Sequence, residues 1–109
     1  MVELIESAAG ALAQTYSTEL ELKWTGEWRE LLVRIENNHA DNALQYRVFG
    51  GIDAAFNYRT ELLFGAATDI NVAAGANDTQ TIQDPWPYIR IQLRGVGGAS
   101  SHITHVAGR

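Results

Sequence analysis

The chain has 109 residues, enough for one domain that can bury a core without covalent cross-links, and 46% of them are hydrophobic. It contains no cysteine, which excludes a disulfide framework and a thiolate metal site. The formal net charge of -5 argues against a nucleic-acid partner, because such proteins usually carry a basic stripe. No apolar run approaches the roughly 20 residues of a membrane span, so no membrane partner is expected.

The first ten residues, 1–10, are predicted to form an N-terminal arm or an edge strand. Val2 and Leu4 alternate with acidic residues, which is typical of extended chain, before small residues interrupt the pattern. Glu3 and Glu6 stand where a secretory signal would carry a basic region and an apolar core. We therefore expect no secretion signal.

Two clear strands follow, at Glu19–Trp24 and Trp28–Glu36, with a turn predicted at Thr25-Gly26-Glu27 between them. Each strand alternates apolar and polar residues with period two, as a half-buried strand does. The pair can be a hairpin or a crossing between two sheets. The residues expected to face the core are Leu20, Leu22, Trp24, Leu31, Val33 and Ile35.

The rest of the chain continues as short strands separated by turn residues. Residues 44–49 alternate until Gly50-Gly51, which we expect to stop the strand, and residues 59–64 suit either a strand or a short helix. Further strands are predicted at 69–73, 79–82, 88–94 and 102–106. About eight short strands at regular spacing are typical of an all-β sandwich, here one domain over residues 1–109.

The stretch from Asp84 to Gly95 is predicted to be a stiff corner that leads into a long strand. Pro85 and Pro87 each lack an N–H donor and hold the preceding residue extended, so full pairing can begin only after the second proline. Trp86 is thereby placed at the rim of the sandwich. Its structural role as a plug of the core is favoured over a role in ligand binding.

The outward face of this long strand carries the candidate interface, which consists of Tyr88, Arg90, Gln92 and Arg94. Arginine and tyrosine are enriched in protein interfaces, which favours a binding surface. The alternative is that the arginines pair with Glu or Asp on adjacent strands. The sequence leaves both interpretations open.

No constellation of residues indicates catalysis, a cofactor or a metal. His102 and His105 are three apart, which places them on opposite faces of a strand, so they cannot share a metal. Glu19 and Glu21 are expected on the solvent side of their strand, too open for paired acid–base work. No nucleophile elbow or phosphate-binding loop is present. We therefore expect a protein that is not an enzyme.

Three segments together resemble small β-sandwich proteins of tailed bacteriophages, in particular capsid decoration or cement proteins. They are Gln45–Gly51, Ala73–Ala76 and Asp84–Arg94, within a likeness of pattern over residues 40–106. The resemblance implies a jelly-roll or Ig-like fold, self-association into dimers or trimers, and binding to the major capsid protein. It also implies a location on the virion after assembly in the host cytoplasm.

A carbohydrate-binding or tail-fibre receptor-binding module is the alternative function. Aromatic side chains can form a flat platform on which sugar rings stack. This alternative predicts that some of Trp24, Trp28, Trp86 and Tyr58 are exposed and coplanar.

Overall fold

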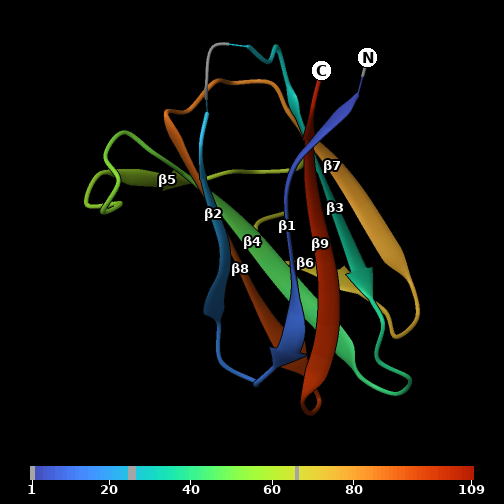
Figure 1. Cartoon of the computed structure of the whole chain (residues 1–109). Coiled ribbons are helices and arrows are strands. Elements are labelled where there is room, and N and C mark those ends of the chain that lie inside the picture. The colour runs from blue at the N-terminus through green and yellow to red at the C-terminus, as the bar shows by residue number, and fades with distance from the viewer. Residues whose placement is uncertain (1, 25–26, 66) are drawn as a thin grey trace.

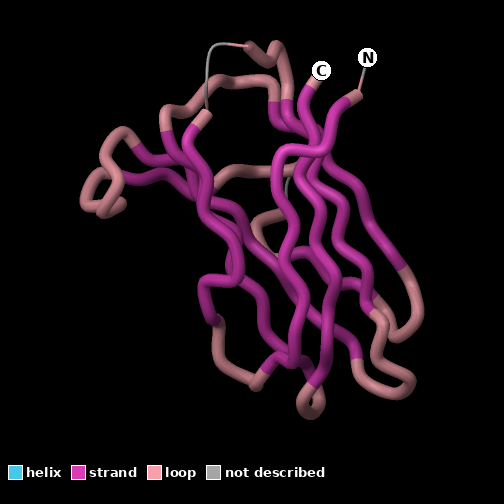
Figure 2. Tube along the Cα trace, in the orientation of Figure 1, coloured by secondary structure: helices cyan, strands magenta, loops and turns pink. Residues whose placement is uncertain are grey.

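The structure is a computed structural model that describes residues 2–24, 27–65 and 67–109. Every regular element in these ranges is a β-strand, and the strands form two antiparallel sheets (Figure 2). Among the described residues there is no helix long and apolar enough to cross a membrane. Thr25 and Gly26 of the predicted turn lie outside the described residues.

Within residues 2–24, 27–65 and 67–109, nine strands make up the two sheets (Figure 1). The four-stranded sheet has the order β1 (Glu3–Leu12), β9 (Ser100–Gly108), β3 (Leu31–Asn37) and β7 (Asn77–Ile82). The five-stranded sheet has the order β2 (Ser17–Lys23), β8 (Tyr88–Val96), β4 (Ala43–Gly51) and β5 (Arg59–Glu61), with β6 (Ile70–Val72) also paired to β4. The chain thus forms the all-β sandwich predicted from its sequence.

The strand order identifies a jelly roll and not an Ig-like sandwich. Strands β1 to β4 alternate between the two sheets, and strands from the second half of the chain return to lie between or beside them. Because β8 pairs with β4 from Ala43 to Gly51, β5 and β6 share the other side of β4. Together they fill the place of one interrupted strand, which reconciles nine strands with the expected eight.

The core lies between the sheets and is built from the inward residues of the alternating strands. All six residues expected to face inward between Leu20 and Ile35 are buried. Complete burial of a Leu, Ile or Val side chain stabilises the fold by about 1.5–3 kcal/mol, so a run of such residues dominates the stability. The fully buried residues of the central strands are Leu44, Tyr46, Val48, Ile89, Ile91 and Leu93.

The connection between β2 and β3 crosses from one sheet to the other, since the two strands belong to different sheets. Residues 3–12 pair along β9 as an edge strand, with a bulge between Leu4 and Glu6. Of the segment 59–64, residues 59–61 form the short strand β5. The helical alternative for that segment is therefore wrong.

The strand β4 continues through Gly50 and Gly51, where we had expected it to stop. The physical reason is close packing of aromatic rings on these two residues. A Cβ atom at Gly50 would lie 2.3 Å from Cγ of Trp86, and one at Gly51 would lie 2.7 Å from Cδ1 of Phe56. The two glycines therefore leave space within the strand for the rings of Trp86 and Phe56, and they do not end the strand.

The corner before β8 has the predicted form. The peptide bonds preceding Pro85 and Pro87 are trans, and β8 begins at Tyr88. The carbonyl of Pro87 accepts a hydrogen bond of 2.9 Å from the N–H of Trp24, which ties the corner to the end of β2. Trp86 is half-buried against the core cluster, so it plugs the rim of the sandwich.

Gly50→Ala is expected to destabilise the fold by about 1–3 kcal/mol, because the new methyl group would overlap the indole of Trp86. Urea unfolding measures the change. Gly10→Ala is the matched control, since the nearest atom to its Cβ would be Oε1 of Glu19, at 3.9 Å. Equal stability of the two variants would contradict the packing of Trp86 on β4.

Candidate interaction surface

The predicted row of Tyr88, Arg90, Gln92 and Arg94 lies on the outward face of β8, and all four side chains are half-buried. The register of β4 and β8 places it beside a second row. Gln45 stands opposite Arg94, Arg47 opposite Gln92, Phe49 opposite Arg90 and Gly51 opposite Tyr88. We call these two rows, with Tyr16 and Phe56, the arginine face.

Arginine and glutamine side chains alternate across the two central strands and hydrogen-bond to each other. Arg94 donates from Nε and Nη2 to Oε1 of Gln45, at 3.0 and 2.6 Å. Arg47 donates from Nε to Oε1 of Gln92, at 2.8 Å, and Gln92 in turn donates to Thr18 Oγ1 at 3.2 Å. Cross-strand pairs of this kind stabilise a sheet and restrict the rotamers of both partners.

Tyr16 covers one end of the arginine face. The guanidinium carbons of Arg47 and Arg94 lie 3.9 and 4.5 Å from the centroid of its ring, in cation–π geometry. Its hydroxyl donates a hydrogen bond to Asp69, just before β6. Burial and this bond raise the pKa of Tyr16 above its ordinary value of 10.0. Tyr16 therefore ties the β1–β2 connection across the outside of the sheet.

Phe56 covers the other end. The guanidinium carbon of Arg90 lies 4.2 Å from the centroid of the Phe56 ring, and the Tyr88 ring meets it edge-on at 6.4 Å. Phe56 has φ of 57°, a left-handed conformation that is rare for a non-glycine residue. The strain at Phe56 is offset by the burial of its ring, which is 1% exposed.

Pairing with carboxylates accounts for only part of this face. Within the described residues, Arg90 has an ion pair with Glu21 at 3.3 Å, whereas Arg47 and Arg94 have amide oxygens and an aromatic ring as partners. Their positive charges are thus held in place without being neutralised in a direct ion pair. The use of this face as an interface remains a prediction.

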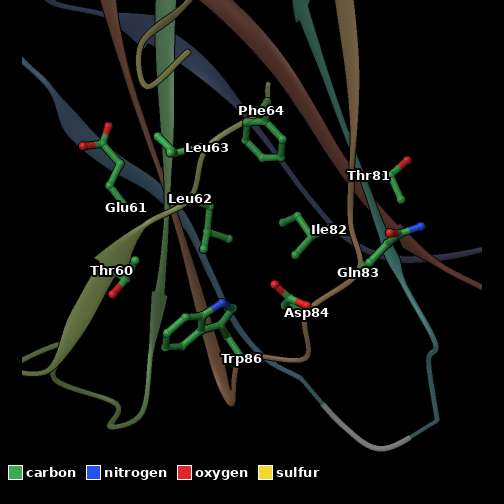
Figure 3. A pocket seen from close by; sticks show the side chains of 10 residues that line it. All are labelled: Thr60, Glu61, Leu62, Leu63, Phe64, Thr81, Ile82, Gln83, Asp84 and Trp86. Carbon is green, nitrogen blue, oxygen red and sulfur yellow. The ribbon is translucent and has the colours of Figure 1, made fainter. Parts of the chain in front are cut away.

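A groove of about 470 Å³ opens at the side of the sandwich, between the segment after β5 and the corner before β8 (Figure 3). Trp86 and Ile82 line it from one side, and Leu62 and Phe64 from the other. Glu61 and Asp84 are also among the residues that line the groove. The sequence did not predict it, because residues 60–64 and 81–86 are brought together only by the two-sheet arrangement.

His102 is buried between the sheets, which the sequence did not indicate. Its Nε2 lies 2.9 Å from Oε1 of Glu19, and its Nδ1 lies 2.8 Å from Oγ1 of Thr104. Glu19 was expected to face solvent, but a bulge between Thr18 and Leu20 in the pairing of β2 with β8 re-aims its side chain. His105 lies half-exposed on the opposite face of β9, as the spacing predicted. No group of three or more metal-binding side chains occurs among the described residues.

The tryptophans do not form the exposed platform that the carbohydrate-binding alternative predicts. Trp24 is buried and donates from Nε1 to the carbonyl of Trp28 at 3.1 Å. The half-buried ring of Trp28 packs on Gly108, as that of Trp86 does on Gly50. Tyr58 is the one exposed residue of the four. The packing of the three tryptophans against the body of the sandwich accounts for their presence without a sugar ligand.

Comparisons with known proteins support the fold alone. No family model matches the sequence, and the search of curated proteins found no relative. A crystal structure of PirA matches 94% of this chain and 93% of its own, with a TM-score of 0.60 and 14% identity. A structure of Bacillus endospore appendages, described as disulfide-linked pili, matches 99% of this chain and 86% of its own, with a TM-score of 0.54 and 10% identity.

A third structure, of the SPBc2 prophage-derived protein YomS, matches 94% of both chains at 12% identity, with a TM-score of 0.44. That score is too low to support an argument about this chain. At identities of 10–14%, the two better matches show a shared β-sandwich architecture and no shared activity.

Glu19→Ala is expected to destabilise the fold by about 1–3 kcal/mol, because it leaves Nε2 of the buried His102 without its partner. Glu6→Ala, which removes an exposed carboxylate from the edge strand β1, is the control and should change stability by less than about 0.5 kcal/mol. Thermal or urea unfolding compares the two. Similar small losses would mean that the bond to His102 adds nothing to stability.

The stability of the protein is expected to fall as the pH rises above 10. The pKa values of Tyr16 and Tyr46 are raised in the folded state, chiefly by burial, so the unfolded chain releases these protons first. Their contribution is complete below pH 10 and is lost above it. Tyr16→Phe should make the decline shallower in urea unfolding measured from about pH 8 to about pH 11. Identical slopes would contradict the raised pKa of Tyr16.

Proposed function

We propose that this chain is a non-enzymatic structural protein of a virus particle, a phage capsid decoration protein that stabilises the head shell through protein–protein contacts. The arginine face is the surface that binds the major capsid protein. On this proposal the chain is located on the virion, after assembly in the host cytoplasm.

The observation that carries the proposal is that the arginine side chains of this face are already held in place in the single chain. Arg47 and Arg94 are each held by a glutamine amide and by the ring of Tyr16. Side chains that are already fixed lose less conformational entropy on binding. Arginine and tyrosine at the centre of an interface contribute most to its affinity. A face of side chains held in place in this way suits another protein surface better than it suits a small molecule.

The charge of the face indicates the chemistry of its partner. Arg47, Arg59, Arg90 and Arg94 all lie on or beside this side of the sheet, in a chain of net charge -5. The surface that it meets should therefore present carboxylates, which arginine binds with two parallel hydrogen bonds. Repetition of one modest contact over a lattice would give high avidity from weak single sites.

Purified protein is expected to co-sediment with intact heads prepared from a strain in which its gene is deleted. Arg94→Glu should reduce this binding by at least about tenfold, since it places a carboxylate against the acidic partner surface. Arg34→Glu is the matched control, because it makes the same change of charge on the exposed face of the other sheet.

Two results would overturn the proposal. If the unaltered protein fails to bind while the shells stay intact, the chain is not a decoration protein of that head. If Arg34→Glu abolishes binding and Arg94→Glu does not, the arginine face is not the contact surface.

A further inference from the structure

The strand β5 has an open edge that faces away from the rest of the molecule. It is the last strand of its sheet and pairs with β4 through Arg59, Thr60 and Glu61. Figure 1 shows β5 and the loop before it projecting from the body of the sandwich. In the part of the chain that the structure describes, no strand pairs with its other side. Such an edge presents backbone donors and acceptors for another strand.

The hydrogen bonds on the inner side show which backbone groups are available. The N–H of Leu62 donates to the carbonyl of Val48 at 2.8 Å, and the N–H of Ile52 donates to the carbonyl of Tyr58 at 3.2 Å. Since the direction of these groups alternates along an antiparallel ladder, Thr60 turns its N–H and C=O towards β4. Arg59 and Glu61 therefore turn theirs towards the open edge.

We propose that β5 pairs antiparallel with β5 of a second copy of this chain, around a twofold axis at Thr60. In this register Arg59 stands opposite Glu61 of the second copy, and Glu61 opposite Arg59. The backbone N–H and C=O groups of Arg59 and Glu61 point towards the open edge. Each of the two Arg59–Glu61 pairs would therefore exchange two backbone hydrogen bonds. The two five-stranded sheets would become one continuous sheet across the dimer.

The side chains of β5 are self-complementary in the same register. Arg59 and Glu61 lie on the same face of the strand, and the described residues offer neither of them an ion pair at 4.0 Å or less. In the dimer each arginine meets a carboxylate of the other copy, twice over by symmetry. A twofold axis at Thr60 brings residue 59 of one copy opposite residue 61 of the other, so these two residues must carry opposite charges. Arg59 and Glu61 do, so a second copy fits this edge by charge as well as by backbone.

Exposed apolar side chains flank the strand and support the same partner. Ile52, Tyr58 and Leu63 are 60%, 71% and 59% exposed, and among the described residues they are three of the five exposed large hydrophobic residues. The register places Tyr58 opposite Leu62 of the second copy, which lines the groove with Trp86. Dimerisation would thus cover apolar surface that is open in the single chain.

The loop that carries Tyr58 is ordered in advance. The carboxylate of Asp53 accepts hydrogen bonds from the N–H groups of Asn57 and Tyr58, at 3.3 and 3.2 Å, and Arg59 donates to the carbonyl of Phe56 at 3.2 Å. A fixed loop loses little freedom on binding. This inference goes beyond the proposed function, since a dimer through β5 needs no capsid and either can hold without the other.

Sedimentation equilibrium from about 1 µM to about 1 mM tests the dimer, since weak protein contacts dissociate in that range. The unaltered chain should form dimers that weaken at high salt. Arg59→Glu and Glu61→Arg should each weaken self-association by at least about tenfold, because each places like charges opposite each other. A mixture of these two variants should restore the association, since every pair is again of opposite sign.

The controls separate this effect from a general change in charge or in folding. Arg34→Glu and Glu36→Arg make the same changes on the other sheet and should leave the dimer intact. The restored association of the mixture shows that both variants are folded. A chain that stays monomeric up to about 1 mM, or a mixture that remains as weak as its components, would overturn the proposal.

Discussion

The alternation of side chains along β8 is the constraint on which the rest of the structure depends. This strand pairs with β2 on one side and with β4 on the other, at the centre of the five-stranded sheet. Its inward residues Ile89, Ile91 and Leu93 are fully buried, and its outward residues form one row of the arginine face. A slip of one residue would place arginine in the core and isoleucine on the surface, so burial of the core also positions the candidate interface.

Besides the apolar core, specific polar contacts join the two sheets. The carboxylate of Glu19 on β2 reaches His102 on β9. A buried imidazole needs partners for its ring nitrogens, so this pair favours one relative position of the sheets over others. Apolar contacts alone are less selective, because they depend on area and not on direction.

The proposed contacts with other proteins use two different properties of the same sheet. The arginine face offers charged groups whose positions are already fixed, and the edge of β5 offers unpaired backbone with a self-complementary charge order. A face and an edge of one sheet point in different directions. A dimer formed through β5 would therefore leave both arginine faces free, and would present two of them to a lattice.

The sequence by itself determined the fold class, the inward faces of the strands and the position of the arginine row. Period-two alternation is a local pattern that can be read from the sequence. Because burying a charge is costly, it decides which side chains of a strand such as β8 face the core. Likewise the two prolines predicted where β8 begins, because they restrict backbone geometry and hydrogen bonding locally. Gly50 and Gly51 misled the prediction, since their role depends on rings that are distant in sequence.

Only the tertiary structure decided which residues meet. Tyr16 and Arg47 reach the arginine row from β1–β2 and from β4, and Glu19 is turned inward by a bulge that no pattern of residue types announces. The choice of a jelly roll over an Ig-like sandwich likewise lies in the strand order. The physical reason is the same in each case: these contacts join residues far apart in the chain, and their geometry follows from pairing and packing that exist only once both sheets have formed.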